Sequence, residues 1–324
     1  MTYHRKMTTK QVETKIVDVF TSEPFQGNPI VVVPYGDSLT DKDKISIIRE
    51  MNSNKGVFIG DSSDGKSDFR ISVFTQDAEI DASYQGLIAA AFVMISDKNV
   101  NLKDGVTNIL TEETKDGVYP LIVSSEGKDL KRLMVMLSWD EKPEFRRVEY
   151  DIAKTAEALG IESEDIRTDV MIQAVKMKYW SMVILVKDES IFDRVVFNRS
   201  RIINMATENE VDFICLVHYD PTKAEDKVFT RIFSFNLNGD SLFRQLEDTI
   251  TGESNAAIAA YLFEHKLMAT KGSKLITSFI QKSKVGRKGE IFVEIDIVNE
   301  VIKEICIGGE ANIVLDGKMK LTPY

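Results

Sequence analysis

The sequence has few of the side chains that build metal centres and disulfide frameworks. It contains only two cysteines and three histidines (His4, His218 and His265), so no zinc-ligand spacing can be assembled and we expect no metal. Cys215 and Cys306 both lie in apolar, strand-like runs. Such surroundings are typical of buried, reduced thiols in a cytosolic protein.

Long apolar runs and signal segments are also missing. No stretch approaches the roughly 18 uncharged apolar residues of a membrane-spanning helix. The basic stretch 1–11 lacks the apolar region of a signal peptide. Lys and Arg total 41 against 51 Asp and Glu, and the net charge of −10 argues against nucleic acid or an anionic membrane as the main partner. We therefore expect a soluble, cytoplasmic protein.

Motifs that bind nucleotides or carry a hydrolytic serine are absent as well. Without G-x-G-x-x-G or G-x-x-x-x-G-K-[ST], no turn is built to cradle a pyrophosphate, and a nucleotide enzyme is disfavoured. The absence of G-x-S-x-G argues against a serine hydrolase. We expect no cofactor.

The length of 324 residues, 43% of them hydrophobic, favours two packed domains. Short β-branched runs predict many strands, and few helices are predicted, near 40–51, 84–96, 151–160, 199–208 and 253–265. This pattern indicates an α+β fold with each helix packed on or inside a curved mixed sheet. Turn-forming composition near 126–128 or 140–146 indicates a boundary. We place the domains at 1–126 and 127–324, with the last strand either staying in the second domain or returning to the first.

The two halves contain a similar pattern. Residues 70–74 and 231–235 both read R-I-x-x-F, and each is followed by a loop, a small polar residue and an Ala-rich helix. Two similar domains related by a pseudo-twofold axis would direct both helix N-termini into one cleft between them. Because unpaired N–H groups and the positive end of the helix dipole favour anions, such a cleft suits a small carboxylic acid.

Several segments resemble the PhzF-like family of phenazine biosynthesis, which is related in fold to diaminopimelate epimerase. The family's opening D-x-F-T…P-F-x-G-N-P is similar to 18–21 and 24–29, and its R-x-F-T strand to 70–75. Its E-D-P-x-T-G-S-A resembles 247–254, and its later glycines resemble Gly286-Arg287 and Gly308-Gly309. The resemblance implies two diaminopimelate epimerase-like domains, each a curved mixed sheet around a central Ala-rich helix. It also implies an isomerase, and a homodimer as is common in the family.

The family's polar site residues are mostly replaced. Its proton-shuttling Glu falls on Lys55, its His on Gln85, and its Ser on Glu253, with Ser254 next to it; only Asp248 is unchanged. The paired cysteines of the related epimerases fall near Ser83 and Thr251, so a two-thiol racemase mechanism is not expected.

From the resemblance we predict catalytic roles for Asp248, Glu253 and Lys55. Each also has a simpler interpretation: Asp248 caps a helix or pairs with Arg244, Glu253 is a solvated first-turn residue, and Lys55 is a surface lysine or a clamp on a substrate carboxylate. Gln85 can form hydrogen bonds but cannot titrate. The predicted substrate-binding residues are Gln85, Ser83, Tyr84, Gly86, Asn28, Thr251, Gly252 and Ser254.

Three functions remain open from the sequence. The first is a cofactor-independent isomerase or epimerase-like enzyme that moves a proton on a small amino- or hydroxy-carboxylic acid. The second is a degenerate relative that binds such an acid without turnover, which the joint loss of Glu, His and Ser favours. The third is a protein that acts through partners, with the cleft as a relic.

Overall fold

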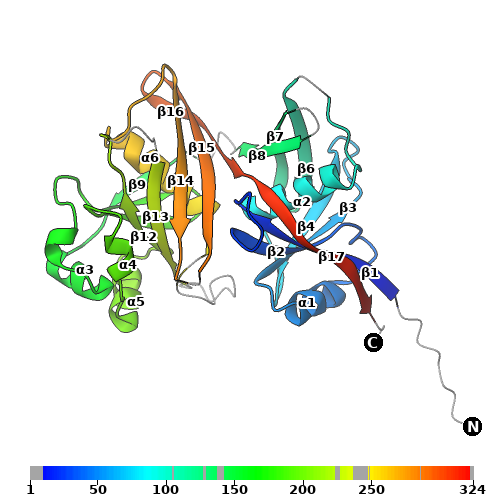
Figure 1. Ribbon diagram of the computed structural model, residues 1–324, viewed down its shortest axis with the longest axis horizontal. Helices are drawn as coiled ribbons and strands as arrows, with labels where there is room; N and C mark the ends of the chain where they lie inside the picture. Colours follow the sequence, from blue (N-terminus) through cyan, green and yellow to red (C-terminus); the bar gives the residue numbers. More distant parts are fainter. Residues whose placement is uncertain are drawn as a thin grey trace, which may run out of the picture.

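The computed structural model describes residues 10–103, 106–126, 129–136, 142–222, 227–235, 247, 249–284 and 286–321. They form two lobes that lie side by side (Figure 1), which we call the N-terminal half and the C-terminal half. The last strand, β17 (Ala311–Leu321), leaves the C-terminal half and pairs antiparallel with β1 (Lys10–Val19) in the N-terminal half. The two ends of the described chain therefore lie in the same lobe.

The N-terminal half is a mixed sheet with the strand order β17–β1–β2–β3–β4–β6–β7–β8, and the short β5 pairs with β4. Helix α1 (Asp41–Glu50) begins at a capping box made by Thr40 and Asp43 and packs outside the sheet. The remaining strands are β2 (Asn28–Val33), β3 (Lys55–Gly60), β4 (Phe69–Thr75), β5 (Glu79–Ile80), β6 (Asn108–Thr114), β7 (Gly117–Glu126) and β8 (Asp129–Met136).

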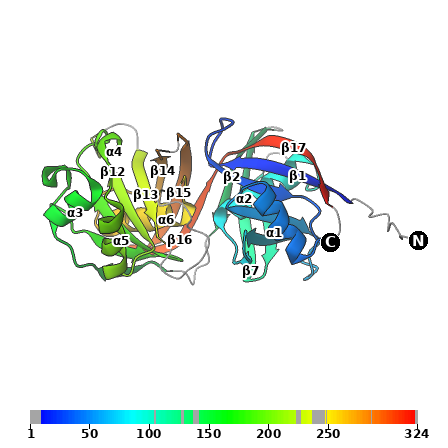
Figure 2. The ribbon, with the colours of Figure 1, turned by 90° about the horizontal axis from the view of Figure 1, so that it is seen from below.

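The C-terminal half repeats this arrangement with the order β9–β10–β11–β12–β13–β14–β15–β16. Its strands are β9 (Glu144–Arg147), β10 (Gln173–Lys176), β11 (Trp180–Leu185), β12 (Phe213–His218), β13 (Lys227–Ser234), β14 (Lys274–Lys282), β15 (Lys288–Val298) and β16 (Val301–Gly309). Its outer helices are α3 (Ile152–Leu159), α4 (Ile191–Arg194) and α5 (Arg199–Glu208), with a 3₁₀ turn, η1 (Ser163–Asp165). In Figure 2, α3 and α5 lie on the outer side of this half and α6 lies inside it.

The repeat extends to the direction of pairing. Parallel pairs β2–β3 and β4–β6 in one half match β11–β12 and β13–β14 in the other. Each half also gives a strand to the other, because β9 follows β8 and pairs with β10, whereas β17 follows β16 and pairs with β1. This reciprocal exchange is the pseudo-twofold relation that the repeated sequence pattern predicts.

Strand β8 pairs with both β7 and β16 and so joins the two sheets. The boundary that we predict after residue 126 falls in the β7–β8 hairpin. The exact division of the chain into domains stays a prediction.

One Ala-rich helix runs through the middle of each half: α2 (Tyr84–Ser96) and α6 (Gly252–Glu264). Three consecutive alanines of α2 (89–91) and Ala256, Ala257, Ala259 and Ala260 of α6 have no exposed surface. A β-carbon on Gly86 would lie only 3.2 Å from Val57 Cγ2. Small side chains are required because a curved sheet surrounds each helix at close distance. One continuous hydrophobic core contains both helices, and smaller clusters lie under α1 and under α3–α5.

Most predicted elements are present within a residue or two, and the helix at 151–160 ends at Gly160 with a φ of 68°, as its sequence indicates. The sequence patterns did not predict β5, β6, β9, β10, α4 and η1. Strand β6 reads NILTEET, whose five polar residues hide the alternation of a strand. Cys215 and Cys306 are buried and reduced, as predicted.

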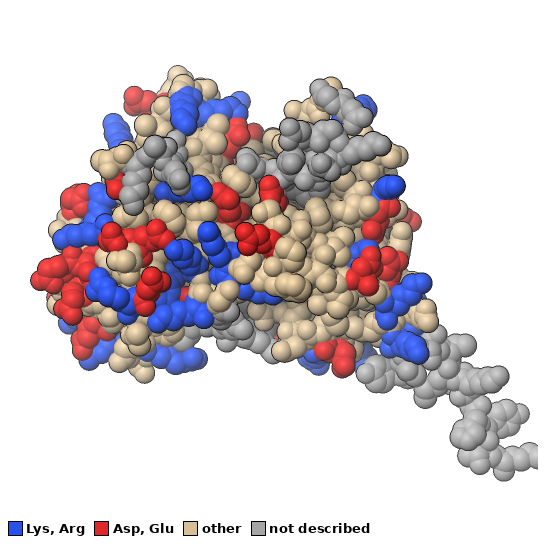
Figure 3. All heavy atoms as spheres, viewed as in Figure 1, with Lys and Arg blue, Asp and Glu red and all other residues tan. Residues whose placement is uncertain are grey.

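The face drawn in Figure 3 carries Lys/Arg and Asp/Glu side chains interspersed over the C-terminal half rather than separated by sign. A continuous basic stripe is the usual footprint of a nucleic-acid-binding surface, and this face has none among the residues drawn in colour. Within the described ranges, no helix is both long and apolar enough to cross a bilayer.

Candidate active site

The N-termini of α2 and α6 meet where the two halves join. A β-carbon on Gly252, the first residue of α6, would lie 3.4 Å from Tyr84 Cδ2, the first residue of α2, and 3.5 Å from Phe20 Cζ. Phe20 is fully buried and has a φ of 66°, which is strained for a bulky residue. Its backbone accepts from Glu290 N at 2.9 Å and donates to Glu310 O at 2.8 Å, so both halves hold it in place.

The two helix starts differ in their hydrogen bonds. Ser83 caps α2, with its Oγ accepting from Gly86 N at 3.2 Å. The side chain of Thr251, the N-cap of α6, makes no capping bond. The N–H groups of Gly252, Glu253 and Ser254 make no hydrogen bond to any described residue. The start of α6 therefore lacks the side-chain cap that Ser83 gives to α2.

A chain of hydrogen bonds links the two helix starts. Gln85 Nε2 donates to Asn28 O at 3.0 Å and to Pro29 O at 3.2 Å. The Asn28 side chain donates in turn to Ile250 O at 2.7 Å, one residue before the α6 cap. Because two carbonyls surround Nε2, the orientation of the Gln85 amide is fixed, and its Oε1 remains free to accept.

Buried side-chain amides form hydrogen bonds with residues at the start of α6. Gln281 Oε1, on β14, accepts from Thr251 N and from Asn255 Nδ2, each at 3.0 Å. Asn255 Nδ2 also donates to Thr251 O at 2.7 Å, and its Oδ1 accepts from Thr230. Asn255 and Gln281 are not among the residues predicted from the sequence. A polar residue at the start of an otherwise apolar helix was the signal that could have identified Asn255.

The predicted catalytic residues are placed as follows. Glu253 is the second residue of α6 and is half-buried, and Gln85 is the second residue of α2, the same position in the other half. Lys55 begins β3 and is half-buried. Strand alternation puts Lys55 on the same face as Val57, which packs on α2. Its ammonium has no charged partner among the described residues. Asp248 lies outside the described residues.

The predicted substrate-binding residues Ser83, Tyr84, Gly86, Thr251 and Gly252 are all buried at the junction. Ser254 lies deeper: its Oγ is buried and makes no hydrogen bond within the described ranges. It lies beside the thiol of Cys215, whose pKa burial raises well above its usual value. The binding role of these residues stays a prediction.

A buried ion pair fixes the segment that leads into α6. Arg231, on β13, donates through Nε and Nη2 to the two carboxylate oxygens of Glu247, at 2.7 and 2.9 Å. Its Nη1 donates to Phe192 O at 2.7 Å. Lys284 N donates to Glu247 at 2.9 Å. Such a bidentate pair holds the approach to Thr251 in one geometry.

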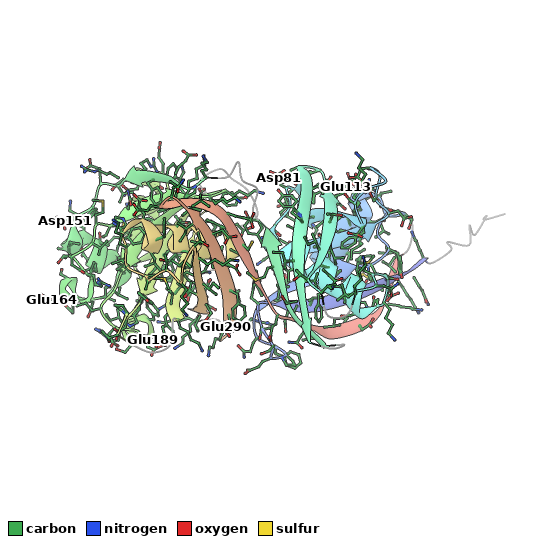
Figure 4. The ribbon with its side chains drawn as sticks, turned by 90° about the horizontal axis from the view of Figure 1, so that it is seen from above. Asp81, Glu113, Asp151, Glu164, Glu189 and Glu290 are labelled. Atoms are coloured by element: carbon green, nitrogen blue, oxygen red, sulfur yellow. The ribbon has the colours of Figure 1, made fainter. Side chains whose placement is uncertain are left out.

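A cavity of about 440 Å³ lies beside the junction, between the loop after β1 and the outer strands of the C-terminal half. None of the residues that we predict from the sequence line it. Figure 4 labels one of its lining residues, Glu290, on β15. The full lining is Thr21, Ser22, Glu23, Gln26, Lys227, Ile280, Lys288, Gly289, Glu290, Phe292 and Glu310. In the part of the chain that the structure describes, no cluster of His, Cys, Asp or Glu could hold a metal ion.

Comparison with protein families matches residues 17–317 to the family described as "Phenazine biosynthesis-like protein" (PhzC-PhzF). An uncharacterised isomerase of Clostridium acetobutylicum is 27% identical over 307 residues, which are 94% of this chain and 97% of that protein.

Solved structures show the same fold. The PhzF-family phenazine biosynthesis protein of Bacillus anthracis superposes with a TM-score of 0.81 at 20% identity, covering 96% of this chain and 99% of that one. A hydroxyproline epimerase of Agrobacterium vitis, solved with bound trans-4-OH-L-proline, has a TM-score of 0.56 at 13% identity and covers 98% and 93%. Both lobes of the chain thus have the epimerase-type architecture.

Proposed function

The chain belongs to the phenazine biosynthesis-like (PhzC-PhzF) family, and from this premise we propose that it is a cofactor-independent isomerase of a small amino- or hydroxy-carboxylic acid. The observation that carries the proposal is the meeting of the two helix starts, with Gly252 against Tyr84. A proton shift at carbon needs a base within reach of the substrate and dipoles that stabilise the developing negative charge. The junction offers both.

The substrate carboxylate would bind at the start of α6. The N–H groups of residues 252–254, which make no hydrogen bond to a described residue, and the positive end of the helix dipole favour an anion there. In α2, by contrast, Ser83 already pairs with the N–H group of Gly86. Because Phe20, Tyr84 and Ile307 cover Gly252, the two halves would have to separate slightly to admit a substrate.

Glu253 is the base that we assign. Its carboxylate lies at the start of α6, where a negative charge is stabilised, and its half-buried side chain reaches solvent. A single carboxyl can remove a proton from one carbon and return it to another. Gln85 would accept a hydrogen bond from the substrate through its free Oε1, and Lys55 would pair with a substrate carboxylate.

A second candidate is a protein that binds the same acid without turnover. The amide of Gln85 favours it, because both of its N–H groups already donate to backbone carbonyls and neither can be given up as an acid. Among the four polar positions that the resemblance identifies, only Asp248 then keeps the family's residue.

Proton NMR in heavy water tests the proposal. A pool of small amino, hydroxy and cyclic carboxylic acids, including the family's dihydro-hydroxyanthranilate type, is incubated with the protein, and the loss of one C–H signal reports exchange. We expect Glu253→Gln to slow that exchange by about 100-fold or more. Glu264→Gln, an exposed carboxyl at the other end of the same helix, is the matched control and should exchange normally.

Each outcome has a distinct meaning. Exchange that persists in Glu253→Gln removes Glu253 as the base. No exchange, together with a ligand that raises the melting temperature, supports the binding-only function. Neither exchange nor a ligand overturns the site at the helix starts.

A further inference from the structure

A second cavity, of about 440 Å³, lies in the C-terminal half at the end of two parallel strands. Lys187 comes two residues after β11, and His218 is the last residue of β12. Strands β11 and β12 run parallel, so their carboxyl ends meet at one edge of the sheet. Crevices at such edges are common ligand sites in α/β units. The lining residues are Arg167, Asp169, Lys187, His218, Tyr219, Asp220 and Pro221.

This cavity is separate from the helix junction. Tyr261, in the last turns of α6, donates to Met171 O at 2.7 Å, two residues beyond Asp169. The cavity therefore lies toward the C-terminal end of α6, whereas the proposed active site is at Gly252. A helix of 13 residues separates its two ends by roughly 20 Å.

Two side chains of the cavity, Lys187 and His218, have a nitrogen that makes no hydrogen bond or ion pair within the described residues. Arg167 is already paired with Asp169, through Nε–Oδ1 at 3.0 Å and Nη2–Oδ2 at 2.5 Å. Lys187 is exposed, and its ammonium makes no hydrogen bond or ion pair in the described part of the chain, although its charge acts on the carboxyls of Asp165 and Asp169. His218 is only 5% exposed, and its Nδ1 contacts Val186 O at 3.3 Å.

The tautomer of His218 follows from this contact. Because a carbonyl can only accept, the contact places a proton on Nδ1. The other ring nitrogen, Nε2, makes no hydrogen bond to a described residue. Of the two acids in the lining, Asp169 is held by Arg167, and Asp220 Oδ1 accepts from Thr222 N and Oγ1.

The N-terminal half shows what this edge of the fold accommodates. At the carboxyl ends of its parallel pair, β2 and β3, the edge is filled by the carboxylate of Asp37. That carboxylate accepts from Asp61 N at 2.8 Å and pairs with Arg70 at 2.7 Å. A β-carbon on Gly60 would lie 1.9 Å from Asp37 Oδ1, so the space is full. One half thus carries its own oxyanion at this edge, and the other has a cavity with basic side chains.

We propose that the cavity at the ends of β11 and β12 binds a small oxyanion, the phosphate or carboxylate group of a metabolite, between Lys187 Nζ and His218 Nε2. Lys187 supplies a compact charge with three donors. His218, protonated on Nε2 when the anion binds, supplies a further donor held in place by Val186. The ligand class follows from the ammonium of Lys187 and from the imidazole of His218 that faces it across the cavity, and it does not depend on the function proposed for the junction.

Imidazole NMR of the whole chain tests this site. The protein has three histidines, so His218→Asn identifies the His218 Cε1–H signal by its loss, and His265 is an internal control. The asparagine keeps a donor toward Val186 O. Titration with inorganic phosphate or acetate should move the His218 signal toward the imidazolium position and leave that of His265 unchanged. Tighter binding of phosphate assigns a phosphoryl group, and tighter binding of acetate a carboxylate.

Two lysine variants decide whether the cavity is responsible. Lys187→Ala should weaken the binding of the anion about tenfold or more, because a charge-assisted contact is lost. Lys154→Ala, an exposed lysine of α3 that does not line the cavity, should leave the binding unchanged. The proposal is overturned if neither anion moves the His218 signal, or if Lys187→Ala binds the anion as the unchanged protein does.

Discussion

The side-chain amide of Asn28 donates to the backbone carbonyl of Ile250 at 2.7 Å and so connects the start of β2 with the residue before the α6 cap. The carbonyl of the same Asn28 accepts from Gln85, the second residue of α2. One residue therefore ties both helix starts together across the junction. If a substrate binds there, Asn28 sets the distance between the donors of α6 and the amide of α2.

We predict that Asn28→Ala destabilises the protein by about 1–3 kcal/mol. The reason is that Ile250, which is 2% exposed, would keep a carbonyl without a donor. Urea unfolding of the two proteins measures the change. Asn101→Ala, an exposed asparagine without a hydrogen bond among the described residues, is the control and should stay within about 0.5 kcal/mol. Equal losses in both variants would show that the contact with Ile250 contributes nothing.

The helices and strands that depend on local sequence patterns could be predicted. The two Ala-rich helices at 84–96 and 253–265 follow from small residues in long apolar runs, and the structure confirms both. The pairing of β17 with β1 was left open, because strand order depends on contacts between residues about 300 positions apart.

The candidate site was predictable only in part. Matching motifs located the helix starts, Lys55 and Gln85, because these residues fall inside recognisable segments. Gln281 could not be found this way: it is one polar residue in strand β14, and its role depends on the packing of β14 beneath α6. Neither the oxyanion cavity nor His218 stood out, because parallel pairing of β11 and β12 is invisible in a single sequence.

We predict that Lys55→Glu gives the protein exchange activity on the family's dihydro-hydroxyanthranilate type of substrate. The substitution restores a carboxylate where the family has its proton-shuttling Glu. Lys55 has no charged partner among the described residues, so the substitution breaks no ion pair there. Proton NMR in heavy water follows the exchange. Lys55→Gln removes the charge without adding a base, and equal exchange in the two variants would contradict the prediction.

We predict that the protein becomes less stable as the pH rises, because of the buried carboxyl of Glu112. Its side chain is fully buried on β6, and neither carboxylate oxygen has a partner in the described residues. Burial first, and then the nearby charge of Asp68, raises the pKa of Glu112 well above its usual value of 4.5. Above pH 4.5 the unfolded chain releases this proton while the folded protein keeps it. The free energy of unfolding therefore decreases, by at most roughly 1.4 kcal/mol per pH unit, until the folded-state pKa is reached.

Glu112→Gln should remove this slope and raise the stability at neutral pH, as measured by urea unfolding between pH 4 and 8. The adjacent Glu113 is a matched control of opposite sign. Hydrogen bonds from Ser63 lower the pKa of Glu113, so its contribution is present above pH 4.5 and is lost as the pH falls. Glu113→Gln should therefore flatten the acid side of the profile. Superimposable profiles for Glu112→Gln and the unchanged protein would mean that Glu112 does not stay protonated in the folded state.

Because Arg231 and Glu247 form a buried ion pair, we predict that the free energy of unfolding depends strongly on both side chains. Arg231→Met or Glu247→Leu alone should destabilise the protein by about 3–5 kcal/mol, because each leaves an uncompensated charge in a dry site. The double variant should recover much of that loss, since no buried charge remains.

Arg201 and Glu157 form a pair at the same 2.7 Å, but with side chains 50% and 56% exposed. Arg201→Met should therefore change the stability by less than about 1 kcal/mol. A double-mutant cycle in urea measures the coupling, and a coupling near zero for the buried pair would mean that the segment leading into α6 is held by its backbone contacts instead.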